Sequence, residues 1–300
     1  MNAKPMRIFL DTDIGPDCDD TAALAILLQR CREGRAALVG VTHCTGSRCG
    51  LACIDSICRA FGVRVPLGTC ADRDFLSDGA ALRYTKPVSE AFRHGFPPDA
   101  PQPDALETCI DVLSKEEDGG VTMVAIGPLN NLARFLTDPV CAPLMQKKVR
   151  RIVTMAGCFE ANPVFTEWNV EMDILAARTV FEKWTGPLDA CPWEAAGSVL
   201  TGACLKEYPD NPAALAYRIY CGEKMLRPSW DLAAVEMALG EVSGLEWSKD
   251  GRIDLDGKGI TRFTPDKAGN RRYARLTDAE AAARALEDVL RRAAQTMTRQ

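Results

Sequence analysis

Acidic side chains gather near the start of the chain, in the segment Asp11-Thr-Asp13-Ile-Gly15-Pro-Asp17-Cys-Asp19-Asp20. Five carboxylates within ten residues repel one another strongly unless a cation lies among them. Hard carboxylate oxygens suit Ca²⁺ or Mg²⁺ far better than zinc or copper. The simpler alternative is an acidic turn that caps the next helix, but a cap accounts for one or two aspartates only. We therefore predict a metal site in this segment.

The elements that must position this segment alternate between short apolar runs and helix-like stretches. We predict strands over 7–10, 37–42, 121–126 and 151–155, and helices over 21–32, 50–61, 129–136 and 174–184. This alternation is typical of an α/β fold with a mostly parallel open sheet flanked by helices. In such a sheet the acidic segment follows the carboxyl end of the first strand, where ligands bind.

The alternation fails between residues 72 and 104, where five prolines and two glycines interrupt the chain. We predict a long surface loop with one short helix there, and interpret residues 73–104 as a flap over the site. Residues 249–300 are expected to form a hairpin over 251–264 and a final amphipathic helix over 277–299. With no repeat or low-complexity tract, residues 1–300 are predicted to be a single domain.

The amino-acid composition limits the classes of molecule that the chain is expected to bind. The chain has 36 basic and 41 acidic residues, a net charge of −5 and no long run of either sign. This balance argues against nucleic acid or an anionic membrane as a partner. No apolar run reaches the roughly 18 residues of a membrane span, and no signal peptide is evident, so we expect a cytoplasmic protein. The 13 cysteines include no CxxC pair and are interpreted as small buried hydrophobes in a reducing compartment.

Several blocks taken together are similar to the inosine/uridine-type nucleoside hydrolases. The acidic segment resembles that family's Asp-x-Asp-x-Gly followed by Asp-Asp at a helix start, with two extra residues between the halves, a variant of a bacterial branch. Later blocks match in order, at Val124–Leu132, Ile152–Gly157, Thr166–Asn169 with Asp173, and Ser229–Asp231. The resemblance covers residues 7–235 and implies a Rossmann-like nucleoside hydrolase fold. It also implies Ca²⁺-dependent hydrolysis of the N-glycosidic bond of ribonucleosides to ribose and free base.

The resemblance also implies a role for individual residues. Asp13 would be the general base, and Ca²⁺ would be held by Asp11, Asp20, Asp231 and the backbone carbonyl of Ile126. Asp19 would bind the ribose 2′-hydroxyl, and the other ribose hydroxyls would be held by Glu167, Asn169 and, near a third such position, Asn162. Breaking the C1′–N bond develops positive charge on the sugar, which surrounding carboxylates stabilise.

The chain departs from the family where the leaving base would be activated. Trp230 stands where several members have a histidine, and Thr45-Gly-Ser47 stands where an asparagine would contact ribose. Three routes remain open: Trp230 stacks on the base, His94 on the flap acts as an acid, or the substrate has a leaving group that needs no protonation.

Two other functions compete with hydrolysis of a nucleoside. A non-catalytic homologue could bind ribose or a nucleoside without turning it over. A haloacid-dehalogenase-type phosphohydrolase also begins with Asp-x-Asp and needs Mg²⁺, but Gly15 and the lack of a suitable downstream lysine argue against it. We expect a small-molecule ribonucleoside as the partner and, from the resemblance, a homodimer or homotetramer.

Overall fold

The computed structural model describes residues 4–77, 79–97, 99–160, 164–240 and 242–298. In this part of the chain, one ten-stranded sheet has the order β11-β10-β12-β6-β5-β4-β1-β2-β3, and β9 pairs with β12 off that path. The strands from β3 to β6 are parallel, and β12 pairs parallel with β6. Only the outer pairings β12–β10, β10–β11 and β12–β9 are antiparallel. The predicted α/β class with a mostly parallel sheet is confirmed.

The strands are short, as is usual for a buried parallel sheet. Their bounds are β1 Met6–Thr12, β2 Ala36–His43, β3 Leu67–Thr69, β4 Val121–Ala125, β5 Val149–Met155, β6 Leu188–Cys191, β9 Leu245–Trp247, β10 Gly251–Leu255, β11 Thr261–Pro265 and β12 Arg271–Leu276. A separate two-stranded ribbon pairs β7 Leu200–Thr201 with β8 Arg227–Pro228.

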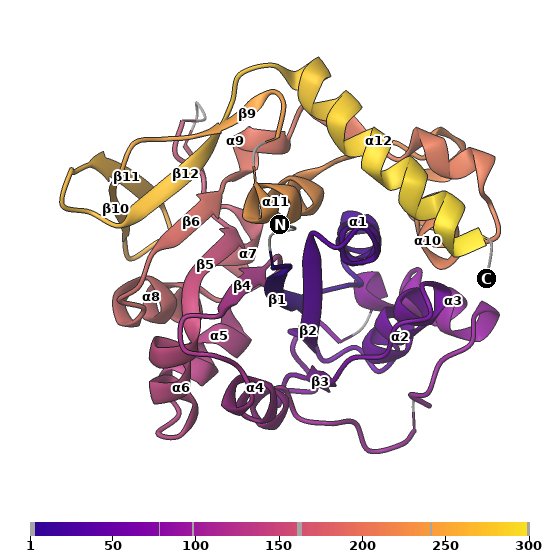
Figure 1. Cartoon of the computed structure of the whole chain (residues 1–300), viewed down its shortest axis with the longest axis horizontal. Helices are drawn as coiled ribbons and strands as arrows, with labels where there is room; N and C mark the ends of the chain where they lie inside the picture. The colour runs from indigo at the N-terminus through magenta and orange to yellow at the C-terminus, as the bar shows by residue number, and fades with distance from the viewer. Residues whose placement is uncertain (1–3, 78, 98, 161–163, 241, 299–300) are drawn as a thin grey trace.

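Helices cover both faces of the sheet (Figure 1). One face carries α1 Asp19–Arg32, α2 Gly50–Ala60 and α11 Trp230–Leu239, with α10 Pro212–Cys221 and α12 Ala279–Thr298 packed outside them. The other face carries α4 Ala105–Ser114, α5 Asn130–Thr137, α6 Cys141–Lys148 and α8 Ile174–Lys183. The remaining short helices are α3 Thr85–Ala91, α7 Trp168–Met172 and α9 Trp193–Ala196, with 3₁₀ turns at η1 Gly79–Leu82, η2 Ala203–Glu207 and η3 Gly222–Lys224.

Strand β1 shows how the two hydrophobic cores are separated. Successive side chains of a strand point to opposite faces of the sheet. Ile8 and Leu10 accordingly pack into the core beneath α1 and α11, whereas Phe9 packs into the core beneath α4 and α5. The same alternation continues to the end of the strand and decides which way its polar residues point.

The segment between residues 72 and 104 differs from the predicted surface loop. It contains both η1 and α3, and Ala81, Tyr84 and Val88 are buried. The Tyr84 hydroxyl donates a hydrogen bond of 2.5 Å to the carbonyl oxygen of Asp17. Part of this segment is therefore packed against the acidic turn.

The C-terminal elements follow the prediction more closely. The expected hairpin over 251–264 is present as the antiparallel pair β10–β11, and α12 is the expected final helix. Strands β6 and β12, which connect the hairpin to the parallel strands, were not predicted. They are too short and too mixed in polarity for a periodicity argument.

None of the 13 cysteines, all of which lie in the described residues, forms a disulfide bond, and eleven of them are buried. Among the described residues, none of them belongs to a group with the geometry of a metal site. This agrees with their interpretation as small buried hydrophobes. No helix in the described ranges has the length and apolar character needed to cross a membrane.

Candidate active site

The candidate site lies where the strand order reverses. Strands β2 and β3 continue from β1 in one direction, and β4, β5 and β6 in the other. Ligands of open α/β sheets bind at such a reversal, outside the carboxyl ends of the strands. Asp13 follows β1, and Ile126 follows β4. Both residues line a cavity of about 350 Å³ at this point.

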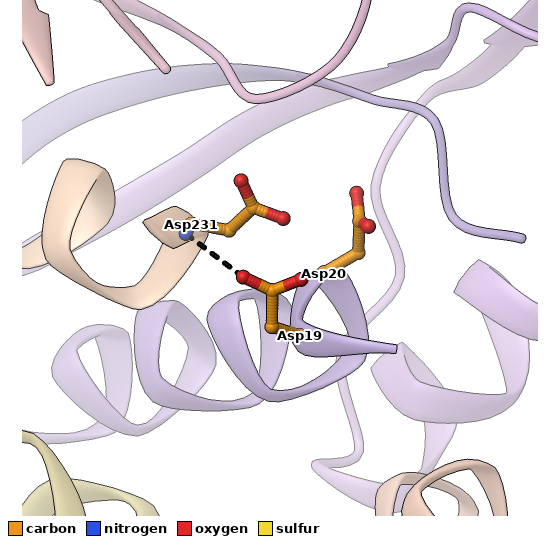
Figure 2. A group of neighbouring side chains, drawn as sticks. All are labelled: Asp19, Asp20 and Asp231. Carbon is orange, nitrogen blue, oxygen red and sulfur yellow. Dashed lines mark hydrogen bonds between the residues drawn. The ribbon is translucent and has the colours of Figure 1, made fainter. Parts of the chain in front are cut away.

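Three buried carboxylates meet at one side of the cavity. Asp19 and Asp20 are the first two residues of α1, and Asp231 is the second residue of α11. Each offers an oxygen, and these oxygens lie within 4.8 Å of one another. Figure 2 shows the three side chains extending from the two helix starts, with Asp19 Oδ2 accepting a 3.1 Å hydrogen bond from the backbone N–H of Asp231. The positive ends of two helix dipoles therefore point at this acidic group.

The buried carboxylates of Asp19, Asp20 and Asp231 need a cation to compensate their negative charge. Burial raises the pKa values of Asp19, Asp20 and Asp231 well above the usual range, and their mutual repulsion adds to the effect. Burial also raises the pKa of Asp13 to about 8. Several carboxylates in so small a volume ionise together only when positive charge compensates them. A set of carboxylate oxygens with a nearby backbone carbonyl fits a hard divalent cation.

The position of Asp13 depends on a glycine in the neighbouring loop. A Cβ atom added to Gly127 would lie 2.8 Å from both Cβ and Oδ1 of Asp13. Real Cβ atoms do not approach side chains so closely, so only glycine allows the chain after β4 to pass there. Thr12 also contributes to this region, because its hydroxyl donates a hydrogen bond to Asp20 Oδ1.

The structure does not bring Asp11 into the acidic group with which it was predicted to share the ion. Asp11 lies on the face of β1 that also carries Phe9, and it is turned toward α5. Its Oδ1 accepts hydrogen bonds of 2.5 Å from the Thr42 hydroxyl and 2.9 Å from Asn131 Nδ2. Asp11 does not line the cavity. The alternation of side chains along β1 explains this difference from the expected ligand set.

Glu167 and Asn169 line the same cavity. Glu167 caps α7 and accepts backbone N–H groups of Gly157, Asn169 and Val170, while burial raises its pKa to about 7. Asn169 donates from Nδ2 to the carbonyl oxygen of Met155 at 2.9 Å. Both are therefore placed with Asp13 and Asp19 as the sequence predicts, although their roles stay predictions. Asn162 lies outside the described residues.

Part of the cavity lining is aromatic. Trp168, Trp193, Tyr220 and Trp230 line the cavity, and Trp168 and Trp193 are each 39% exposed. The Trp230 indole donates a hydrogen bond of 2.9 Å to the carbonyl oxygen of Trp193, which fixes its orientation. Trp230 thus lies where a stacking residue was predicted.

Sequence reasoning missed several residues that line the cavity, among them Trp193, Tyr220 and Arg227. Arg227 stands only two residues before the Ser229–Asp231 block, and this proximity was the available signal. Nothing comparable marks Trp193 or Tyr220, which reach the cavity from α9 and α10.

The two histidines of the chain do not line the cavity. His94 Nδ1 accepts a 3.2 Å hydrogen bond from the Phe96 N–H, and the next residue, Gly95, bonds to Asp55 on α2. The structure therefore does not bring His94 to the predicted site. His43 is fully buried and lies 3.1 Å from the carbonyl oxygen of Ile14, inside the acidic turn. His43 therefore has a structural position behind that turn.

Comparison with known proteins assigns this architecture to a family. The model of the inosine-uridine preferring nucleoside hydrolase family matches residues 8–287. An uncharacterised protein of Schizosaccharomyces pombe is 29% identical over 188 residues, which are 58% of this chain and 57% of that relative. The chain thus spans little more than half the length of this relative.

Solved structures show the same fold at low sequence identity. An inosine-uridine preferring nucleoside hydrolase from Bacillus anthracis is 20% identical with a TM-score of 0.72, covering 97% of this chain and 99% of its own. A purine-preferring ribonucleoside hydrolase from Gardnerella vaginalis is 19% identical with a TM-score of 0.72, covering 98% of this chain and 100% of its own. The family match decides against the phosphohydrolase alternative.

Proposed function

The chain belongs to the inosine-uridine preferring nucleoside hydrolase family, and from this premise we propose that it is a calcium-dependent ribonucleoside hydrolase. It would convert a ribonucleoside and water to ribose and the free base. The observation that carries the proposal is the convergence of Asp19, Asp20 and Asp231, from two distant parts of the chain, beside Asp13 in one cavity.

Asp20, Asp231 and the backbone carbonyl of Ile126 are the groups we assign to the ion. Asp11 is left out of this set because it does not line the cavity and its Oδ1 accepts hydrogen bonds from Thr42 and Asn131. Oxygen donors of this kind match the preference of Ca²⁺ for several carboxylate and carbonyl ligands. When bound, the ion supplies positive charge that lowers the pKa of water and compensates the crowded carboxylates.

Asp13 is the group that we assign to proton transfer. It is nearly buried, follows β1 directly and is held in place by the tight approach of Gly127. A carboxylate in this position accepts a proton from the attacking water while the water oxygen bonds to C1′ of the sugar. Positive charge then develops on the sugar ring, and the surrounding carboxylates stabilise it electrostatically.

The remaining polar residues of the cavity are assigned to the sugar. Asp19 accepts only the Asp231 N–H with one oxygen, so its other oxygen is available to the ribose 2′-hydroxyl. Glu167 and Asn169, which line the same cavity, are assigned to the other hydroxyls. This arrangement directs the base toward the aromatic part of the cavity, where Trp230 can stack on it.

A reducing-sugar assay across a panel of nucleosides tests the function. The protein is stripped with a chelator, and activity is measured before and after Ca²⁺ or Mg²⁺ is restored. We expect ribose to appear only after a divalent ion is added, with Ca²⁺ the more effective. The Asp13→Asn variant should lose at least about 10²-fold in kcat and still bind ribose. Ribose binding by the wild-type protein without any turnover would contradict hydrolysis and favour a non-catalytic binding homologue.

The finer properties of the molecule remain predictions. We propose that residues 1–300 act as one domain, supported by a single sheet that extends from β3 to the C-terminal hairpin. We also propose a homodimer or homotetramer in the cytoplasm, acting on free nucleosides and not on nucleic acid or membranes. Light scattering on the purified protein measures the assembly state directly.

A further inference from the structure

Departure of the base requires a group that the proposed mechanism has not yet supplied. As the C1′–N bond breaks, its electron pair passes to the base, which becomes negatively charged. A general acid is the usual remedy. Neither histidine of the chain lines the cavity, so a side chain that stabilises the departing base has to come from the other lining residues.

Arg227 is a cation in the aromatic part of the cavity. It lies on β8, and its Nε donates to the two oxygens of Asp17 at 2.9 and 3.0 Å, while Nη2 also donates to Asp17. Its guanidinium carbon lies 5.2 Å from the centroid of the Tyr220 ring and 5.2 Å from that of Trp230. One carboxylate and two aromatic rings therefore fix the plane and position of this guanidinium.

One nitrogen of this guanidinium has no protein acceptor. Among the described residues, Asp17 takes up Nε and Nη2, and no hydrogen bond engages Nη1. Although burial lowers the pKa of Arg227, its hydrogen bonds to Asp17 and the charge of Asp17 raise that pKa above the ordinary value. The side chain therefore stays charged and cannot give up a proton. What it offers to the cavity is a fixed hydrogen-bond donor with positive charge.

Arg227 contacts both the acidic turn and the aromatic rings of the cavity. Asp17 precedes Asp19 by two residues, and Trp230 immediately precedes Asp231. With the sugar assigned to the carboxylates, we assign the base to the part of the cavity that Trp230 and the neighbouring guanidinium line.

We propose that Nη1 of Arg227 donates a hydrogen bond to an exocyclic carbonyl oxygen of the leaving base and stabilises the negative charge that collects there. This inference rests on the proposed nucleoside hydrolysis. In the balanced step, the water oxygen bonds to C1′, one water proton passes to Asp13, and the C1′–N electron pair leaves with the base. The base anion is held by Arg227 until it takes a proton from solvent.

A donor at this place selects among bases. Hypoxanthine carries a carbonyl oxygen where adenine carries an amino group, so inosine and adenosine differ mainly at the group that Arg227 would contact. The amino group is itself a donor and cannot accept the guanidinium hydrogen. A site built to bond a substrate group discriminates against the analogue that lacks it. We therefore expect the wild-type enzyme to favour inosine over adenosine through Arg227.

The test compares Arg227→Met and Arg227→Lys on inosine, adenosine and 4-nitrophenyl riboside, whose leaving group is already a stable anion. Methionine keeps much of the length and packing of the arginine but removes its donors. We expect kcat/KM for inosine to fall about 10- to 100-fold, with much smaller losses on the other two substrates. Lysine retains the positive charge but lacks the planar set of guanidinium donors. It should therefore give an intermediate loss of kcat/KM, again largest for inosine.

Arg83→Met is the matched control. The Arg83 guanidinium also lies over the Tyr220 ring, at 4.8 Å, but this residue is exposed and does not line the cavity. Its substitution should leave the ratio of inosine to adenosine turnover unchanged. Ribose binding and melting temperature report whether each variant is folded.

Equal losses on all three substrates, in both the methionine and the lysine variants, would overturn the role of Arg227 while leaving nucleoside hydrolysis intact. Failure of the wild-type enzyme to release ribose from any nucleoside would overturn both proposals. The two failures are therefore distinct.

Discussion

Acid should destabilise this protein through His43, the buried histidine behind the acidic turn. Its Nε2 lies 3.1 Å from the carbonyl oxygen of Ile14, which can only accept, so Nε2 carries the proton in the neutral ring. Nδ1 is buried and has no hydrogen-bond partner in the structure. Protonation would place a second N–H at Nδ1 with nothing to accept it. The ring is also packed closely against Gly50, where an added Cβ would lie 2.1 Å from it.

The size of the effect follows from the pKa of the ring. Burial, the main cause, lowers the pKa of His43 from 6.5 to about 4. Between pH 6.5 and pH 4, His43 binds a proton in the unfolded chain but not in the folded chain. The free energy of unfolding therefore falls as the pH decreases through this window and levels off below it. Each pH unit corresponds to about 1.4 kcal/mol. The expected loss is about 2 kcal/mol between pH 6.5 and pH 5, and about 3 kcal/mol in full.

Urea unfolding of the wild type and of His43→Gln, at pH 7 and pH 5 with saturating Ca²⁺, measures this contribution. Comparing the two proteins at the same pH cancels the titration of the carboxylates that they share. Glutamine can still donate to Ile14 but does not titrate, so its free energy of unfolding should fall by about 2 kcal/mol less. His94→Gln removes the other histidine of the chain and should behave as the wild type. A His43→Gln variant with the pH dependence of the wild type would refute the reasoning.

Three further substitutions test the site and its support. Gly127→Ala should lower kcat with little loss of ribose binding, because the added Cβ would displace Asp13. An unchanged kcat would show that the loop after β4 can move to accept the Cβ. Glu236→Gln should lower the free energy of unfolding by about 1–2 kcal/mol in urea titrations, since it removes the charge that joins α11 to Arg30 of α1 while Arg30 keeps its ion pair with Glu33. Asp11→Asn should bind Ca²⁺ nearly as well as the wild type in isothermal titration, and a large loss of affinity would restore it to the ligand set.

Much of this architecture can be predicted from local sequence pattern. Apolar runs of strand length that alternate with helical segments predict a mostly parallel sheet, and this was confirmed. The acidic segment after the first strand predicts a ligand site at the sheet edge, because the carboxyl ends of parallel strands face the same way. The resemblance of Ser229–Asp231 to a late block of the family, and not local pattern, implied the distant partner of this segment, and Asp231 does lie beside Asp19 and Asp20.

Tertiary structure decided which members of these motifs face the same space. Asp11 and Asp13 are equally acidic in sequence, yet β1 ends between them, so Asp11 stays on the α5 face and Asp13 lines the cavity. Arg227 is held in the aromatic part of the cavity by its ion pair with Asp17, which lies 210 residues away in the sequence. Local sequence pattern does not show a contact between segments so far apart. His94 was expected on a flap over the site, but the chain around it is bonded to α2. Local pattern specifies the elements and their polar ends, whereas the packing of elements distant in sequence determines which of those ends meet.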